Sequence, residues 1–368
     1  MCELLFYGII APNRLESEAK MKAKSGFGAI LLAVMVLVAG CGSEPSARQT
    51  ITVMDTVATL SATGRESEAA VSESMKRLKD LEAMASPNIE GSDVCKLSAA
   101  AGTGEWVPLH PEIYHMLEVS QQYSQLTGGA WDVTMGPLVN LWGIGTDKAH
   151  VPSAEEITAA KSLTGWQKVE LQPETHSARL MQAGMSLDFG GIAKGMALDE
   201  VRKIYLKHGI KDGLINLGAS SIYALGKNDK SKDWRIGIRH PRSEDKDAVL
   251  AVVPISDQAL STSGDYERFF EQDGRRYHHI LDPQTGAPAW TGVMGDTIVI
   301  DGSVEDAGML SDLLTTAVFV LGPEKGQQFM EQLPAGITGM IVDQQQHLHP
   351  VRGFEDQLTE RNEEFPVE

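Results

Sequence analysis

Hydrophobic residues recur at helical spacing in several stretches of this chain. In residues 66–84, Val71, Met75, Leu78 and Leu81 are separated by Lys and Glu, a pattern typical of an amphipathic helix with one buried face. Similar stretches, marked by Pro at a start or Gly at an end, predict further helices. One helix is expected from 111 to 128, and another follows a capping box formed by Ser153 and Glu156. Two more are expected over 193–209 and from 303 to 322.

Short stretches rich in β-branched residues lie between these helices and predict strands. They cover 51–60, 213–225, 234–240, 249–255, 277–281 and 296–300. Helices and strands do not alternate regularly along the chain, which argues against a doubly wound parallel sheet. We therefore expect an α+β fold over residues 51–352, a single domain with antiparallel sheets and packed helices. Residues 353–368 are highly charged and predict a frayed tail.

The first 40 residues have the organisation of an export signal, with Met21 as its expected start. Lys22 and Lys24 precede an uncharged stretch of about 15 residues, which is shorter than the roughly 20 that a membrane span needs. The stretch ends in Val-Ala-Gly-Cys41, which resembles a bacterial lipobox. We expect removal of residues 1–40, lipidation of Cys41, and a short tether over 41–50. The expected location is the periplasmic side of the envelope, on either membrane. The alternatives are a plain cleavage site with an incidental cysteine, or a short membrane anchor.

Charge and cysteine content exclude several classes of function. The 368 residues include 32 Lys and Arg against 50 Asp and Glu, a net charge of −18. Because nucleic-acid binding depends on basic side chains, we expect no nucleic-acid partner. Three cysteines without a C-x-x-C pair exclude a disulfide framework and a cysteine-built zinc site. His347 and His349 lie in a polar turn, and we interpret them as solvated rather than metal-bound.

A glycine-rich segment from 185 to 195 joins a predicted strand to a predicted helix. Gly190 and Gly191 allow a ligand to approach the backbone closely, and amide groups at a helix start bind anions. Lys194 adds a positive charge at the same place. The alternative is a tight structural turn with a surface lysine.

Two other segments contain residue types suited to binding a planar ring and a cation. Residues 129–145 combine Trp131 and Trp142 with Asp132 and several glycines. Asp312 and Thr316 lie one turn apart on a predicted helix, and a carboxylate with a hydroxyl suits Mg²⁺. For both segments a purely structural role is the alternative.

One histidine is a candidate general base. His279 lies three residues before the start of a D-P-Q-T-G turn at 282–286, and an imidazole is suited to accept a proton near neutral pH. The alternative is a histidine that only fixes its own loop.

Several of these segments, taken in order, resemble one family. The segments are GAWDVTMGPLVNLWGIG from 129, LDFGGIAKGMALD from 187, INLG from 215, STSGDYER from 261, HILDPQTG from 279 and DLLTTA from 312. Together they resemble the bacterial FAD:protein FMN transferases, the ApbE-like flavin transferases once called thiamine-biosynthesis lipoproteins. The resemblance covers residues from about 50 to 350.

The resemblance implies an enzyme that binds FAD with Mg²⁺ and transfers FMN to a threonine of a target flavoprotein, releasing AMP. Acceptors would carry a threonine flavinylation motif, as in subunits of membrane redox complexes, and the fold would be T-fold-like. Asp312, Thr316 and a backbone carbonyl near Gly191 would hold the metal, and His279 would be the base. The family usually has Gly where this chain has Asp55. Contacts to FAD are implied for Met54, Ala130, Trp131, Asp132, Asp188, Lys194 and Leu281.

Two other functions use the same residues. A Mg²⁺-dependent FAD pyrophosphatase would let water attack the same phosphorus and give FMN and AMP. A lipid-tethered flavin-binding protein would hold FAD without turnover.

Overall fold

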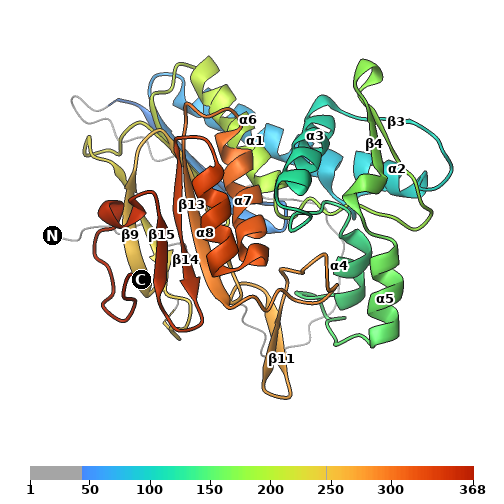
Figure 1. The fold of residues 1–368 in the computed structure, drawn as a ribbon. Coiled ribbons are helices and arrows are strands. Elements are labelled where there is room, and N and C mark those ends of the chain that lie inside the picture. Colours follow the sequence, from blue (N-terminus) through green and yellow to red (C-terminus); the bar gives the residue numbers. More distant parts are fainter. Residues whose placement is uncertain (1–43, 246) are drawn as a thin grey trace, which may run out of the picture.

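The computed structural model describes residues 44–245 and 247–368 (Figure 1). The predicted export signal and Cys41 lie outside these residues. Within the described ranges, no helix combines the length and the apolar character that crossing a membrane requires.

An eight-stranded antiparallel sheet forms the centre of the fold. Its strand order is β1-β2-β6-β7-β10-β13-β14-β15. The bounds are Ser46–Val53 (β1), Thr56–Thr63 (β2), Asp212–Leu217 (β6), Ser221–Leu225 (β7), Gln258–Gly264 (β10), Val293–Asp301 (β13), Ile337–Asp343 (β14) and Leu348–Val351 (β15). Antiparallel neighbours joined by short turns fit the α+β class expected from the sequence.

Two predicted strands are in fact hairpins. Residues 51–60 divide between β1 and β2, because Met54 and Asp55 adopt left-handed backbone conformations with φ of 53° and 56°. Residues 213–225 divide between β6 and β7, where Gly218 and Ala219 have φ of 71° and 60°. Two consecutive residues with positive φ form the tight turns that hairpins favour. Apolar alternation continues on both sides of such turns, so the pattern alone did not reveal them.

Helices cover one face of the central sheet, as Figure 1 shows for α1, α6, α7 and α8. α7 (Ala307–Leu321) packs on β10 and β13, and α6 (Ala193–Lys207) packs between α7 and α1 (Ser67–Ala85). The predicted helix from 303 to 322 ends at Gly322, and Pro323 starts a further helix, α8 (Pro323–Gln332). Pro at the first position of a helix is favourable because its missing N–H needs no partner there.

A second layer covers the other face of the sheet. Successive strand residues point to opposite faces, so Ile298 and Ile300 pack under the helices and Val299 packs on the other side. The hairpin of β8 (Trp234–Arg239) and β9 (Val249–Ile255) packs on this face and supplies six of the 17 buried residues of the second core. The sheet is therefore buried on both faces.

The remaining elements lie beside these layers. The capping box predicted for Ser153 and Glu156 is present at the start of α5. Strand β12 ends at His278, three residues before the predicted end of the strand. The bounds are Asp93–Ala99 (α2), Pro111–Leu126 (α3), Gly136–Trp142 (α4), Ala154–Ser162 (α5), Val107–Pro108 (β3), Val169–Gln172 (β4), Ser177–Leu180 (β5), Phe269–Gln272 (β11) and Arg275–His278 (β12).

The charged tail is packed, so the expectation that it is frayed is wrong. Phe354 and Phe365 are fully buried in the second core, and the Phe365 ring meets the His240 ring edge-on at 4.9 Å. Thr359 pairs with Val252 on β9 through backbone hydrogen bonds. Two apolar anchors outweigh the charge of the segment because each buries a large aromatic surface.

Replacing one anchor tests this packing. Phe365→Ala is expected to lower the free energy of unfolding by about 3–5 kcal/mol, the usual cost of truncating a buried Phe. Val367→Ala, two residues on at a side chain that is 39% exposed, is the control and should cost less than about 0.5 kcal/mol. Urea unfolding of both variants and the parent measures the difference. Equal stability of Phe365→Ala and the parent would contradict a packed tail.

Candidate functional site

Two helices approach each other closely at the centre of the site. A Cβ on Gly195 of α6 would lie 2.3 Å from the carbonyl oxygen of Gly308 on α7. A Cβ on Gly308 would likewise lie 2.6 Å from the carbonyl oxygen of Gly195. Only glycine permits this contact between backbones. It brings the first turn of α6, with Lys194, against Asp312 on α7.

Asp312 is a buried carboxylate held by residues of two other elements, α6 and β7. Its Oδ1 accepts hydrogen bonds from the Lys194 ammonium at 2.8 Å and from the Ser221 hydroxyl at 3.0 Å. Its Oδ2 accepts from the Gly195 amide at 3.1 Å. Buried carboxylates require such partners, because losing hydration without them is costly. Lys194 also donates to the Gly190 carbonyl at 3.2 Å, which ties the glycine segment to the ion pair.

Gly191 forms a small cradle beside this ion pair. A Cβ there would lie 2.7 Å from Thr316 Oγ1 and 2.9 Å from the Trp131 ring. The backbone of residue 191 and the Thr316 hydroxyl therefore lie within reach of one ligand, one helical turn from Asp312. A carboxylate, a hydroxyl and a backbone carbonyl are hard oxygen donors of the kind that Mg²⁺ prefers. These residues fit the metal that the resemblance implies.

The Trp131 loop, between α3 and α4, is held by Asp132. Asp132 Oδ1 accepts from the backbone and the hydroxyl of Thr134 at 2.8 and 2.6 Å, and Oδ2 accepts from the Trp166 amide at 3.0 Å. Burial raises the pKa of Asp132, and these hydrogen bonds oppose that shift. Both oxygens are already engaged, so Asp132 fixes the position of its neighbours Ala130 and Trp131. Within the described residues, the buried Trp131 indole N–H has no hydrogen-bond partner.

His279 has the protonation state that a general base requires. Its Nδ1 lies 3.2 Å from the Arg268 carbonyl, and its backbone N–H donates to the same oxygen at 3.0 Å. A carbonyl only accepts, so Nδ1 carries the proton and Nε2 keeps a free lone pair. Loss of hydration, reinforced by the charges of Arg268 and Lys194, lowers the pKa of His279 well below its usual value. The imidazole is therefore neutral at physiological pH.

The adjacent histidine differs because it faces the core. Burial lowers the pKa of His278 to about 4, and its ring packs edge-on against Phe319 at 5.3 Å. Of these two adjacent histidines, His278 therefore has a structural role in the core, and His279 remains the candidate base.

The other predicted FAD contacts lie in different parts of the fold. Met54 lies in the β1–β2 turn, at the end of the sheet that also carries Ser221. The Asp188 amide donates to the Val133 carbonyl behind the Trp131 loop, and its side chain accepts from the Gly190 amide at 2.8 Å. Leu281 packs with Leu138 of α4 in a separate small apolar cluster.

Sequence reasoning missed a row of hydroxyl groups between β10 and α7. Ser261 bonds Ser311 at 2.8 Å, and Ser263 bonds Thr315 at 2.9 Å. Ser261 and Ser263 face α7 together because alternate residues of a strand share a face. That alternation in the S-T-S-G segment was the available signal, but no role was assigned to it. Ser221 was also missed, and only the strand order brings it to Asp312.

The amide groups at the start of α6 are less available than expected. The Gly195 amide is bound to Asp312, and the Ala193 amide donates to the Phe189 carbonyl at 2.9 Å. Positive charge at this helix start therefore comes mainly from Lys194.

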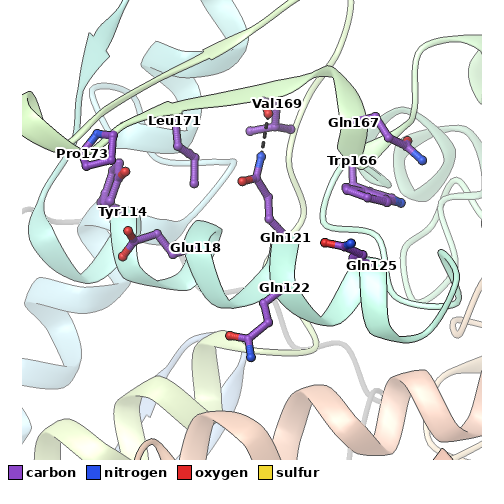
Figure 2. A pocket seen from close by; sticks show the side chains of 10 residues that line it. All are labelled: Tyr114, Glu118, Gln121, Gln122, Gln125, Trp166, Gln167, Val169, Leu171 and Pro173. Carbon is purple, nitrogen blue, oxygen red and sulfur yellow. Dashed lines mark hydrogen bonds between the residues drawn. The ribbon is translucent and has the colours of Figure 1, made fainter.

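A groove of about 560 Å³ lies elsewhere, between α3 and β4 (Figure 2). Tyr114, Gln121 and Gln125 line it from α3, and Gln121 donates to the Val169 carbonyl at 2.6 Å. None of the predicted site residues lines this groove. It touches the site only through Trp166, whose amide binds Asp132.

Known proteins resemble this chain in sequence and in fold. A FAD:protein FMN transferase of Treponema pallidum is 32% identical over 359 residues, 92% of this chain and 97% of its own. The ApbE protein of Thermotoga maritima superposes with a TM-score of 0.76 at 29% identity, over 86% of this chain and all of that one. The flavin transferase ApbE of Vibrio cholerae gives 0.75 at 26% identity with the same coverage.

The family model of the ApbE family matches residues 54–341, which contain every predicted site residue except Cys41. With its ordered motifs, its antiparallel fold and this match, the chain belongs to the ApbE family.

Proposed function

We propose that this protein is a FAD:protein FMN transferase that uses Mg²⁺ and a threonine acceptor. The observation that carries the proposal is the convergence of Asp312, Thr316, Gly191 and Lys194. The charge of Lys194 also contributes to the lowered pKa that keeps His279 neutral. Relatives with matching length carry the same activity in their names.

The reaction exchanges one bond to phosphorus for another. The acceptor threonine oxygen forms a bond to the FMN phosphorus, the bond to the bridging oxygen of the pyrophosphate breaks, and AMP leaves with that oxygen. The hydroxyl proton passes to a base. Bound Mg²⁺ would neutralise charge that develops on the phosphate oxygens.

The residues of this chain have distinct parts in that exchange. Asp312 and Thr316, with the backbone at Gly191, hold the metal. Lys194 supplies a second positive charge for the phosphates. His279 Nε2 accepts the threonine proton, because a threonine hydroxyl is a weak nucleophile until a base removes its proton.

The Trp131 loop supports a place for the flavin ring. The Trp131 ring borders the Gly191 cradle. Its buried indole N–H has no acceptor among the described residues and could donate a hydrogen bond to a ligand. Ala130, Asp132, Asp188 and Leu281 shape the surroundings, and Met54 approaches from the β1–β2 turn. The acidic surface is suited to a protein partner rather than to nucleic acid.

We also propose that the mature protein begins at a lipidated Cys41 and remains on the periplasmic side of the envelope. The support is the lipobox-like sequence before Cys41 and the short polar stretch 42–45 that precedes the first strand. The tether is shorter than the expected 41–50, because β1 begins at Ser46 and pairs with β2 from that residue on.

Removing the charge of Asp312 tests the metal site. Asp312→Asn is expected to reduce FMN transfer by at least ~10²-fold, the scale of losing one main electrostatic group in a transition state. Asp306→Asn, at the start of the same helix and bound to His115, is the control and should keep parental activity. Transfer is measured as the mass gain of an acceptor protein. Retained Mg²⁺-dependent transfer in Asp312→Asn would show that the ion pair is only structural.

Replacing His279 distinguishes transfer of FMN to a threonine from hydrolysis of FAD by water. His279→Ala is expected to slow transfer by about 10²–10⁴-fold, the usual contribution of a positioned base. AMP release without acceptor should fall less, because a metal-bound water loses its proton more readily than a threonine does. Undiminished transfer would refute the assignment of His279 as base. AMP release that is the same with and without acceptor would favour the pyrophosphatase.

The pH profile gives an independent test of the same residue. A base works only when deprotonated, and the pKa of His279 is held well below 6.5. Transfer by the parent protein should therefore persist as pH falls through 6.5 and decline only at lower pH. An acid limb at or above 6.5, or an unchanged limb in His279→Ala, would contradict this.

Cys41→Ser tests the anchor. We expect the parent protein to fractionate with membranes and to carry acyl mass at Cys41, whereas the variant is released and still transfers FMN. Parent protein that is exported without acyl mass would refute the anchor and leave the flavin site unaffected.

A further inference from the structure

Two histidines and two acidic residues converge at the turn between β14 and β15. Asp343 ends β14, His347 closes the turn, and His349 lies on β15. Glu368 approaches from the tail. None of the four belongs to the flavin site described above.

The hairpin register places three of these side chains on one face. Ile341 pairs with His349, and Asp343 is joined to His347 by a backbone hydrogen bond of 3.1 Å. Paired residues of an antiparallel hairpin, and residues two apart, share a face. The spacing D-x₃-H-x-H therefore gathers one carboxylate and two imidazoles, although each residue looks solvated in the sequence.

The tail brings the fourth group to the same place. Backbone hydrogen bonds join Glu368 N to Leu348 O at 2.9 Å and Leu348 N to Pro366 O at 2.8 Å. They hold residue 368 beside the start of β15, and buried Phe365 anchors the segment before it.

Each histidine approaches both carboxylates, and the ligand atoms of Asp343, His349 and Glu368 all lie within 4.8 Å of one another. Asp343 Oδ2 lies 2.8 Å from His349 Nε2 and 3.8 Å from His347 Nδ1. Glu368 Oε2 lies 3.7 Å from His349 Nε2 and 3.4 Å from His347 Nδ1. Ligands around a tetrahedral zinc, with bonds of about 2.0–2.1 Å, are about 3.3–3.4 Å apart. Movement of the Glu368 and His347 side chains, which are 63% and 38% exposed, brings their distances to that value. The nearly buried pair of Asp343 and His349 has to open from 2.8 Å.

One carboxylate is already oriented for such a role. Asp343 Oδ1 accepts from the amides of Gln345 and His347 at 2.8 and 2.9 Å, which leaves Oδ2 directed at the histidines. In metal sites, a coordinating carboxylate is commonly oriented by hydrogen bonds to the oxygen that does not bind the metal. Asp343 and His349 are nearly buried, with side chains 9% and 13% exposed, whereas Glu368 is 63% exposed. The cluster is thus open to solvent on one side, which gives a metal a path of entry.

Another histidine of the chain shows what an ordinary ion pair looks like. His115 also meets two carboxylates, but Asp306 faces its Nε2 at 2.8 Å and Glu118 faces its Nδ1 at 3.8 Å. Those acids lie on opposite sides of the ring. At His349 both acids face the same nitrogen, which carries only one proton and so serves only one of them.

We propose that Asp343, His349 and Glu368, with His347 as fourth ligand, bind a divalent transition metal of the zinc class. Imidazole nitrogen favours Zn²⁺ or Co²⁺ over Mg²⁺ and Ca²⁺, which prefer oxygen. Two carboxylates and two neutral imidazoles balance the charge of the ion. The metal joins the tail to the β14–β15 hairpin and strengthens the packing made by Phe365.

Metal binding by the full-length, tag-free protein tests the proposal. The protein is stripped with chelator, transferred to excess Mg²⁺ to fill the Asp312 site, and titrated with Zn²⁺ by calorimetry and with Co²⁺ by visible absorption. We expect one Zn²⁺ per chain that Mg²⁺ does not displace, and intense Co²⁺ bands typical of four-coordinate geometry. Asp312→Asn should bind this Zn²⁺ like the parent, so failure of the flavin-site proposal would not affect the result.

Two variants and one control decide the outcome. His349→Asn and the exposed change Glu368→Gln should each weaken Zn²⁺ binding by about 10-fold or more, at least the loss seen when supporting groups are removed. His115→Asn is the matched control and should bind like the parent. Absence of Mg²⁺-resistant Zn²⁺ binding in the parent would overturn the proposal. Parental affinity in folded Glu368→Gln and His349→Asn would overturn it equally.

Discussion

A single buried negative charge, the carboxylate of Asp312, determines how the centre of this protein is arranged. Burying it is tolerable only with partners, and these come from separate parts of the fold: Lys194 and the Gly195 amide from α6, and Ser221 from β7. The same carboxylate is the main candidate ligand for Mg²⁺. The requirement to satisfy this charge in the absence of a ligand therefore places Lys194 where the phosphates of FAD would need it.

Close backbone contact makes this arrangement possible. The paired glycines 195 and 308 let α6 and α7 touch, and Gly191 leaves space beside Thr316 and Trp131. Hydrogen bonds between hydroxyl groups of β10 and α7 then fix the distance of α7 from the sheet. The departure at Asp55 has a local explanation, because its φ of 56° is a conformation that Gly adopts freely and Asp tolerates better than most residues.

The two faces of the central sheet are covered by different elements. The helices on one face carry the residues of the proposed flavin site, and the opposite face is closed by β8, β9 and the packed tail. The tail shows how two buried aromatic rings outweigh a high charge. It also supplies Glu368 to a cluster of histidines at the far edge of the sheet, where a metal would reinforce the closure. The two proposed metal sites thus differ in chemistry as well as place: oxygen donors at Asp312, and nitrogen with oxygen at His349.

The sequence by itself determined the α+β class, the principal helices, the capping box at Ser153 and the family, because helical periodicity, end signals and long ordered motifs are local. It also identified Asp312, Thr316, Gly191 and Lys194, which the structure brings together. Tertiary structure alone decided what depends on strand order or on distant burial. The turns at Met54 and Gly218, the contact of Ser221 with Asp312 and the direction of the His279 lone pair are of this kind. So are the anchoring of Phe365 and the meeting of Asp343, His349 and Glu368. Hydrophobic alternation continues through a hairpin turn, and a charged segment carries no local sign of the surface that will bury its two aromatic residues.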